Sequence, residues 1–374
     1  MKTLNQILIK INNKCKNKNI KSFVFGKGLA DILVNKTPEK INILVKANKN
    51  DKIIEELEIL NDKLIKISFD KKIPEHNITY HNLFIEIEDL LKGNIKEIKP
   101  VNSFKDLKRK IIKLSKEGKE NIKKDFNVIF EVLQEACDEN LTIEINTVKE
   151  ILKNKSLVKK TPKRFIYNYI RFICSQEKPK KIVSYLNTFG ISEELFNTQL
   201  VESPFCNHLK PNDYFEFMFL IFNNVELNNI EEFLINKVGF HLRDTHFVVN
   251  LYNAISEIED ESELSARKFI NKLGTTQRIS NVIRLVKLLG FKELGKNIKS
   301  QKDLNIFKDE ICLDESTIKA AFGIKNENTI KNLISIAKQK IIDDPEYNEK
   351  YKILTYLNKE RGILWQEEKK EVSS

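Results

Sequence analysis

The stretch FVFGKGLADILVNKTPEKINILV, residues 23–45, decides the fold class predicted for this chain. In order, it predicts an apolar strand, a glycine turn, a short helix, a loop that contains Pro38 and a second apolar strand. Glycines after a strand let backbone N–H groups approach an anion, and the following helix points its positive end at the same place. This order of elements therefore predicts a corner that can hold phosphate.

From Gly26 to Ile43 the stretch resembles, without a gap, the signature of the bacterial tRNA nucleotidyltransferase (CCA-adding enzyme) and poly(A) polymerase family, approximately G-G-x-V-R-D-x-L-L-G-x-x-P-x-D-I-D-I. Lys27 stands at the second glycine of that signature. Later segments continue the resemblance, at residues 105–114, 124–131 and 161–168, so that it covers residues 22 to about 200.

The resemblance implies a nucleotide pocket whose catalytic chemistry is missing. The two aspartates that hold Mg²⁺ in the family fall on Lys40 and Asn42. An ammonium group and an amide cannot assemble a two-metal site, because Mg²⁺ takes carboxylate oxygens. Glu86, on a later strand, is a single remaining acid, and one acid is not enough. We therefore expect no catalytic residue, no metal and no cofactor, with Mg²⁺ required only if the chain is active.

The base-reading element of the family is altered as well. Asp125 remains, but Val128 and Glu131 stand where the family has arginines. The resemblance implies that selection of nucleotides by paired hydrogen bonds is lost. The remnants of the nucleotide pocket are then Gly26, Lys27, Gly28, Asp31 and Asp125.

Periodicity divides the chain into a mixed N-terminal part and a helical remainder. Residues 1–102 alternate helices with strands, expected at 23–25, 41–45, 64–69 and 83–88. From about residue 103 the apolar spacing is helical. The predicted fold class is α+β, with a small mixed-sheet nucleotidyltransferase-like head (1–102), a helical neck (103–160) and an elongated, all-α body and tail (161–374).

Composition favours an intracellular chain with an anionic partner. The 374 residues carry a net charge of +11, which favours a polyanion such as RNA. The five cysteines are widely separated and form no C-x-x-C pair, which indicates reduced thiols without a structural zinc. No apolar run is long enough to span a bilayer, and the N-terminus reads as an amphipathic helix. We expect a cytoplasmic protein without a membrane partner.

Basic residues gather where the resembling family grips the acceptor end of tRNA. Each lysine alone is explained by a solvated surface, but the set favours contact with RNA phosphates. The RNA-binding residues predicted in this way are Lys108, Arg109, Lys110, Lys159, Lys160, Lys163 and Arg164.

These observations predict a non-catalytic RNA-binding pseudoenzyme related to tRNA nucleotidyltransferases, with tRNA or another RNA 3′ end as ligand. Three alternatives stay open. The chain could be a divergent but active template-independent nucleotidyltransferase, a helical scaffold that docks a partner protein or a second copy, or a metal-dependent enzyme of another type.

Overall fold

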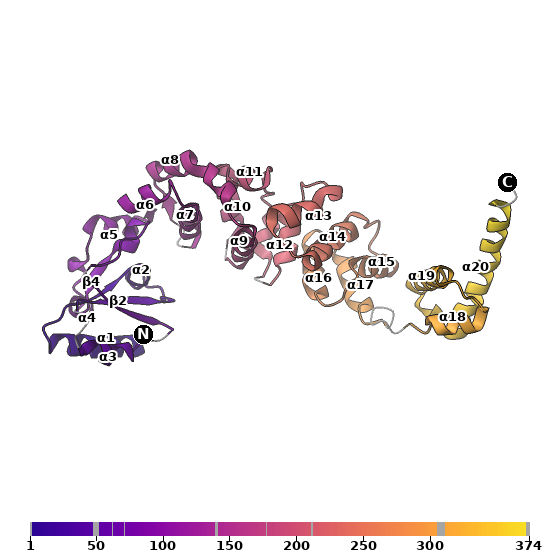
Figure 1. Cartoon of the computed structure of the whole chain (residues 1–374), viewed down its shortest axis with the longest axis horizontal. Coiled ribbons are helices and arrows are strands. Elements are labelled where there is room, and N and C mark those ends of the chain that lie inside the picture. Colours follow the sequence, from indigo (N-terminus) through magenta and orange to yellow (C-terminus); the bar gives the residue numbers. More distant parts are fainter. Residues whose placement is uncertain are drawn as a thin grey trace. The chain divides into compact units, whose positions relative to one another are not determined.

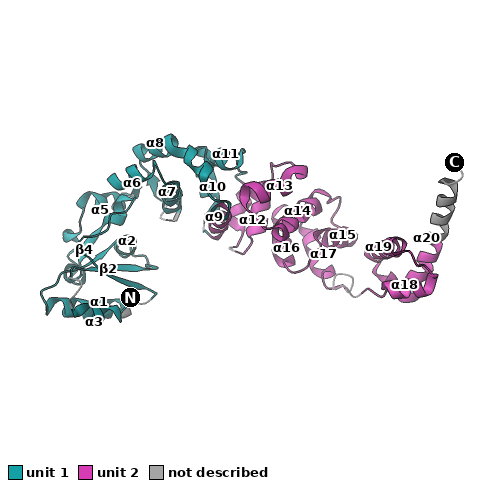
Figure 2. Cartoon of the chain, in the orientation of Figure 1, with its two compact units in different colours: residues 1–165, 176–202 teal, residues 166–175, 203–374 magenta. Residues whose placement is uncertain are grey.

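The structure is a computed structural model of the 374-residue chain that describes residues 2–47, 52–61, 63–70, 72–138, 141–176, 178–210, 212–304 and 311–371. Contacts divide the chain into two compact units, coloured separately in Figure 2. Unit 1 contains residues 1–165 and 176–202, and unit 2 contains residues 166–175 and 203–374. The head, neck and body boundaries at residues 102 and 160 stay predictions.

Unit 1 contains every strand in the described part of the chain. The strands are β1 (Ser22–Phe25), β2 (Ile41–Val45), β3 (Ile65–Phe69), β4 (Phe84–Glu86), β5 (Ile111–Ile112) and β6 (Thr142–Ile143). The helices are α1 (Lys2–Lys16), α2 (Lys27–Leu33), α3 (Ile53–Glu58), α4 (Ile87–Leu91), α5 (Val101–Lys108), α6 (Lys116–Asn121), α7 (Asn127–Asp138), α8 (Ile145–Asn154), α10 (Pro179–Thr188) and α11 (Ile191–Phe196), with the 3₁₀ turns η1 (Thr79–Asn82), η2 (Ile95–Glu97) and η3 (Lys155–Lys160). Helix α9 (Lys163–Ser175) runs from unit 1 into unit 2.

A four-stranded mixed sheet forms the N-terminal part of unit 1, at the indigo end of the chain in Figure 1. Its strand order is β3-β2-β1-β4. Strand β1 is antiparallel to β2 and β4, and β2 is parallel to β3. All four residues of β1 are buried, as expected for an apolar central strand covered on both faces. The predicted small mixed sheet followed by a largely helical chain is confirmed.

Helix α1 covers one side of this sheet. Its buried residues Leu4, Leu8, Ile11 and Cys15 recur at helical spacing, and the helix contacts α3, α4 and β1. The predicted N-terminal amphipathic helix is confirmed. Its apolar face packs on the core of the sheet.

Two predicted elements end earlier than their periodicity indicates. The strand expected at 83–88 ends at Glu86, which pairs with Phe23 of β1, and helix α4 begins at the next residue, Ile87. The helical spacing expected from about residue 103 breaks after Lys108. Lys110 has a positive φ of 56°, and Ile111 and Ile112 then pair as a short parallel strand with β6.

Glu144 caps the start of α8, where its carboxylate accepts the backbone N–H of Thr147 at 3.0 Å. Before α9, the hydroxyl oxygen of Thr161 is buried without a hydrogen bond among the described residues.

Unit 2 contains helices and no strand in its described residues. After the end of α9 it contains α12 (Tyr214–Ile221), α13 (Ile230–Phe233), α14 (Leu242–Ser256), α15 (Glu263–Leu273), α16 (Ile279–Leu288), α17 (Lys292–Gln301), α18 (Glu315–Phe322), α19 (Glu327–Asp343) and α20 (Lys350–Glu371), the 3₁₀ turns η4 (Pro204–His208), η5 (Leu227–Asn229) and η8 (Pro345–Tyr347), and the π-helical turn η6 (Leu234–Val238). Within the described ranges, no helix is both long and apolar enough to cross a membrane.

Candidate functional site

The glycine turn after β1 has the predicted strand, turn and helix order. Gly26 has a φ of 81°, precedes α2 and donates its backbone N–H to the carbonyl of Leu83 at 3.0 Å. A Cβ at Gly28 would overlap the carbonyl oxygen of Lys40. Gly28 is therefore required for the close packing of α2 on the start of β2, and this packing does not depend on a bound nucleotide.

The two positions that the resemblance aligns with the family's metal-binding aspartates lie at the start of β2. Lys40 is exposed, and Asn42 is half-buried on β2, paired with Phe25 of β1. Cross-strand partners share a face of a sheet, and the ring of His76 stacks on Phe25 at 6.3 Å and 27°. Aromatic groups thus line the sheet face that carries Asn42, and the residues at 40 and 42 do not fit Mg²⁺.

Other acids do not complete a metal site in the described chain. Glu86, on β4, pairs with Lys21 at 2.6 Å and is a surface ion pair. A search of the described residues finds no group of three or more His, Cys, Asp or Glu side chains placed to hold a metal.

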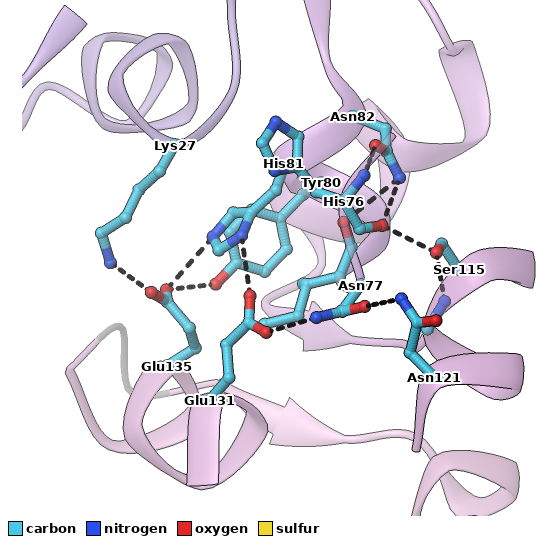
Figure 3. Close-up of polar contacts among 12 residues, drawn as sticks. Lys27, His76, Asn77, Tyr80, His81, Asn82, Ser115, Asn121, Glu131 and Glu135 are labelled. Carbon is cyan, nitrogen blue, oxygen red and sulfur yellow. Dashed lines mark hydrogen bonds and ion pairs between the residues drawn. The ribbon is translucent and has the colours of Figure 1, made fainter. Parts of the chain in front are cut away.

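A buried carboxylate on α7, that of Glu135, contacts the residue that follows Gly26 in the glycine turn. Glu135 accepts hydrogen bonds from the ammonium of Lys27 and the hydroxyl of Tyr80, each at 2.6 Å, as Figure 3 shows. Its side chain is 6% exposed. Burial opposes ionisation and is the largest influence on this group, yet His81 and Lys27 together lower the pKa of Glu135 to about 2. Glu135 is therefore a fixed negative charge.

A second carboxylate, one helical turn earlier on α7, completes an ion network. Glu131 lies 3.7 Å from Nδ1 of His81, whose Nε2 lies 3.5 Å from Glu135. Burial acts to lower the pKa of His81, but the two carboxylates raise it overall. Asn77 donates to Glu131 at 2.8 Å. Two carboxylates thus face the ammonium of Lys27 and the imidazole of His81 (Figure 3).

The loop before η1 is held against this network by side-chain bonds to its backbone. Asn82 accepts the backbone N–H of His76 at 2.6 Å and donates to its carbonyl at 3.0 Å. The hydroxyl of Ser115 donates to the same carbonyl at 2.7 Å. The imidazole of His76 is partly buried, and this burial, together with the charge of His81, lowers its pKa. We conclude that His76 stays neutral near pH 7 and adds no charge to the turn.

The structure places the predicted pocket residues in different environments. Gly26, Lys27 and Gly28 lie together at the turn, and Asp31 is buried on α2. Asp125 is exposed and accepts the backbone N–H of Asn127 at 2.9 Å, at the start of α7.

The predicted RNA-binding residues are all exposed. They are Lys108, Arg109, Lys110, Lys159, Lys160, Lys163 and Arg164. Lys108 lies over the ring of Phe104 at 4.4 Å, and Lys159 pairs with Glu194 at 3.0 Å while its side chain remains 64% exposed. An exposed pair of this kind is worth little, so these side chains are accessible to a polyanion.

Sequence reasoning did not single out Asn77, Tyr80 or Glu135 of this network. One signal was present. Glu131 and Glu135 are four residues apart, so they share a face of α7. Glu135 also stands between the buried Leu133 and Ala136, where an acid requires a partner.

Comparison with solved structures finds CCA-adding enzymes. The Bacillus stearothermophilus CCA-adding enzyme in complex with CTP matches with a TM-score of 0.70 and 11% identity, over 97% of this chain and 98% of that one. The Thermotoga maritima CCA-adding enzyme complexed with tRNA matches with a TM-score of 0.61 and 16% identity, over 95% and 96%. An apo CCA-adding enzyme matches with a TM-score of 0.61 and 16% identity, over 95% and 93%.

No protein-family model and no curated protein sequence matches the chain. At identities of 11% and 16%, the structural likeness establishes the fold alone. The predicted resemblance is confirmed at that level, and it covers nearly the whole chain instead of ending near residue 200.

Proposed function

We propose that this chain is a non-catalytic, RNA-binding relative of tRNA nucleotidyltransferases that acts in the cytoplasm on tRNA or an RNA 3′ end of similar shape. The observation that carries the proposal is the pair Lys40 and Asn42 at the expected metal positions, within a fold that covers nearly all of a CCA-adding enzyme complexed with tRNA.

The ion network at the turn supports the loss of catalysis. A triphosphate brings several negative charges, which the active family neutralises with metal ions. Here the ammonium of Lys27 already pairs with Glu135 at 2.6 Å, and His81 lies between two carboxylates. An incoming phosphate would have to compete with the buried carboxylate of Glu135 for the ammonium of Lys27, and the competition is costly because separating the pair leaves an unpaired charge.

An addition assay tests the loss of catalysis. Purified protein is incubated with labelled CTP or ATP, Mg²⁺ or Mn²⁺, and tRNA that lacks its terminal CCA. We expect no extension, since positions 40 and 42 supply no carboxylate. Extension that is lost in Glu86→Gln but kept in Glu88→Gln would contradict the proposal and favour a divergent active enzyme.

A binding series tests the RNA claim. One variant replaces Lys108, Arg109 and Lys110 by Ala, a second replaces Lys159, Lys160, Lys163 and Arg164, and a control replaces Lys63, Lys66 and Lys96, which are exposed on other parts of unit 1. We expect tRNA affinity to fall with salt at a log-log slope of roughly −0.7 to −0.9 per phosphate contacted. Both cluster variants should show shallower slopes, and the control should match the unaltered protein.

Ligand choice is the second half of that series. Structured RNA with a single-stranded end should bind better than duplex DNA of equal length, because A-form shape and the 2′-hydroxyl are read by RNA-binding surfaces. Equal, weak binding of tRNA, duplex RNA and duplex DNA by all variants would remove the RNA proposal and favour the protein-docking scaffold.

A further inference from the structure

Two arginines of unit 2 lie against one tyrosine ring. Arg171, exposed on α9, has its guanidinium carbon 4.9 Å from the ring centroid of Tyr214, the first residue of α12. Arg278, immediately before α16, lies at the same distance, 4.9 Å, from that ring. Neither arginine belongs to the basic clusters that the sequence pointed to.

Arg171 contacts two aromatic rings and has no anionic partner among the described residues. Its guanidinium also lies 5.7 Å from the ring of Tyr167. Within the described part of the chain, Arg171 forms no hydrogen bond or ion pair. Stacking on a ring leaves the N–H donors at the edge of the guanidinium plane, in the planar fork that fits two phosphate oxygens. Arg171 is thus an ordered donor without an acceptor.

Arg278 is only partly neutralised by the protein. Its guanidinium also contacts Phe215, at 4.4 Å from the ring, and its nearest acid is Glu216 at 3.5 Å. Glu216 is fully buried, and neither of its carboxylate oxygens has a hydrogen bond in the described chain. Burial raises the pKa of Glu216 to about 7, so the negative charge beside Arg278 is incomplete at neutral pH.

Two neighbouring acids, Asp213 and Asp244, already have partners within the protein. Asp213 is buried and pairs with Arg284, and Asp244 accepts from the hydroxyl of Tyr167 at 3.5 Å. Arg278 already donates to the backbone carbonyl of Asn212, so Arg171 is the donor for a bound anion. The guanidinium of Arg278 against the same ring adds positive charge to this surface.

We propose that Arg171 and Arg278, held on Tyr214, form a binding site for the phosphodiester backbone of RNA. The inference rests on the proposed function and adds to it a specific contact in unit 2. A phosphodiester suits the site because the planar fork of Arg171 fits two phosphate oxygens.

The experiment compares matched single substitutions in tRNA binding. Arg171→Gln removes the charge and the fork from an exposed position, Arg171→Lys keeps the charge and removes the fork, and Lys299→Gln removes one exposed charge of unit 2, on α17, as the control. We expect Arg171→Gln to weaken binding about tenfold, as the loss of one charge-assisted bidentate contact, and to reduce the salt slope by about 0.7 to 0.9. Arg171→Lys should keep the slope and lose part of the affinity.

Chemical protection identifies the ligand. Phenylglyoxal modification of Arg171, read by peptide mass spectrometry, should be blocked by tRNA and not by inorganic phosphate at equal ionic strength. Equal protection by phosphate would overturn the assignment to RNA. Binding by Arg171→Gln that equals the Lys299→Gln control would overturn the site while leaving the proposed function intact, whereas absence of RNA binding by the unaltered protein would overturn both.

Discussion

Replacing Glu135 by Gln tests whether the ion network stabilises unit 1. The drop of its pKa from an ordinary 4.5 to about 2 corresponds to about 3 kcal/mol of folding free energy, at roughly 1.4 kcal/mol for each pKa unit. Because the folded pKa is lowered, this contribution is fully present above pH 4.5 and is lost as the pH falls toward 2. Glu135→Gln should therefore destabilise unit 1 by about 3 kcal/mol at pH 7 and remove this acid-sensitive component.

The assay must report on unit 1 separately. The single tryptophan, Trp365, lies in α20, so its fluorescence reports on the tail. Urea unfolding is better followed by thiol labelling of Cys15 on α1 and Cys137 on α7, both in unit 1. Glu120→Gln, in an exposed pair on α6, is the matched control and should change stability by less than about 0.5 kcal/mol. If Glu135→Gln matches this control, the network does not stabilise the fold.

Three other substitutions test separate parts of the argument. Lys27→Met removes one cation that faces Glu135, so the acid loss of stability in unit 1 should begin at a higher pH; an unchanged pH profile in urea unfolding would show that the ion pair contributes nothing. Gly28→Ala should lower stability by about 1 to 3 kcal/mol, measured as a lower Tm, because its Cβ overlaps the Lys40 carbonyl. The pKa of Glu216 is raised to about 7, so stability of unit 2 is full below pH 4.5 and falls as the pH rises through 7; Glu216→Gln should abolish that fall in thiol-labelling melts between pH 6 and 8.

The fold was predictable where burial is periodic along the chain. The apolar runs at 23–25 and 41–45 became β1 and β2, because central strands are covered on both faces and are therefore mostly apolar. The short strand at Ile111–Ile112 was not predictable, since two apolar residues fit a helical stripe equally well. Their pairing with β6 is decided by residues about thirty positions away.

The absence of carboxylates at positions 40 and 42 was predictable from the sequence, whereas the ion network around Glu135 was not. Positions 40 and 42 could be identified from the family resemblance, since the signature aligns without a gap. The bond from Lys27 to Glu135 joins residues 108 positions apart, and no local pattern encodes such a contact. The same holds for Arg171 and Arg278, which meet on Tyr214 from three different helices or their ends.

Gly28 and the residues at positions 40 and 42 are under different physical constraints. This difference explains why the glycine fits the family signature while positions 40 and 42 depart from it. Gly28 permits α2 to pack against β2, so its loss would cost folding energy whether or not a nucleotide binds. Carboxylates at 40 and 42 would serve only metal ions, and without metals they would repel each other. A chain without the reaction can therefore replace those acids at little cost to the fold, while a lysine at position 27 gains a buried partner in Glu135. The glycines are then evidence of the fold, and only positions 40 and 42 are evidence of the chemistry.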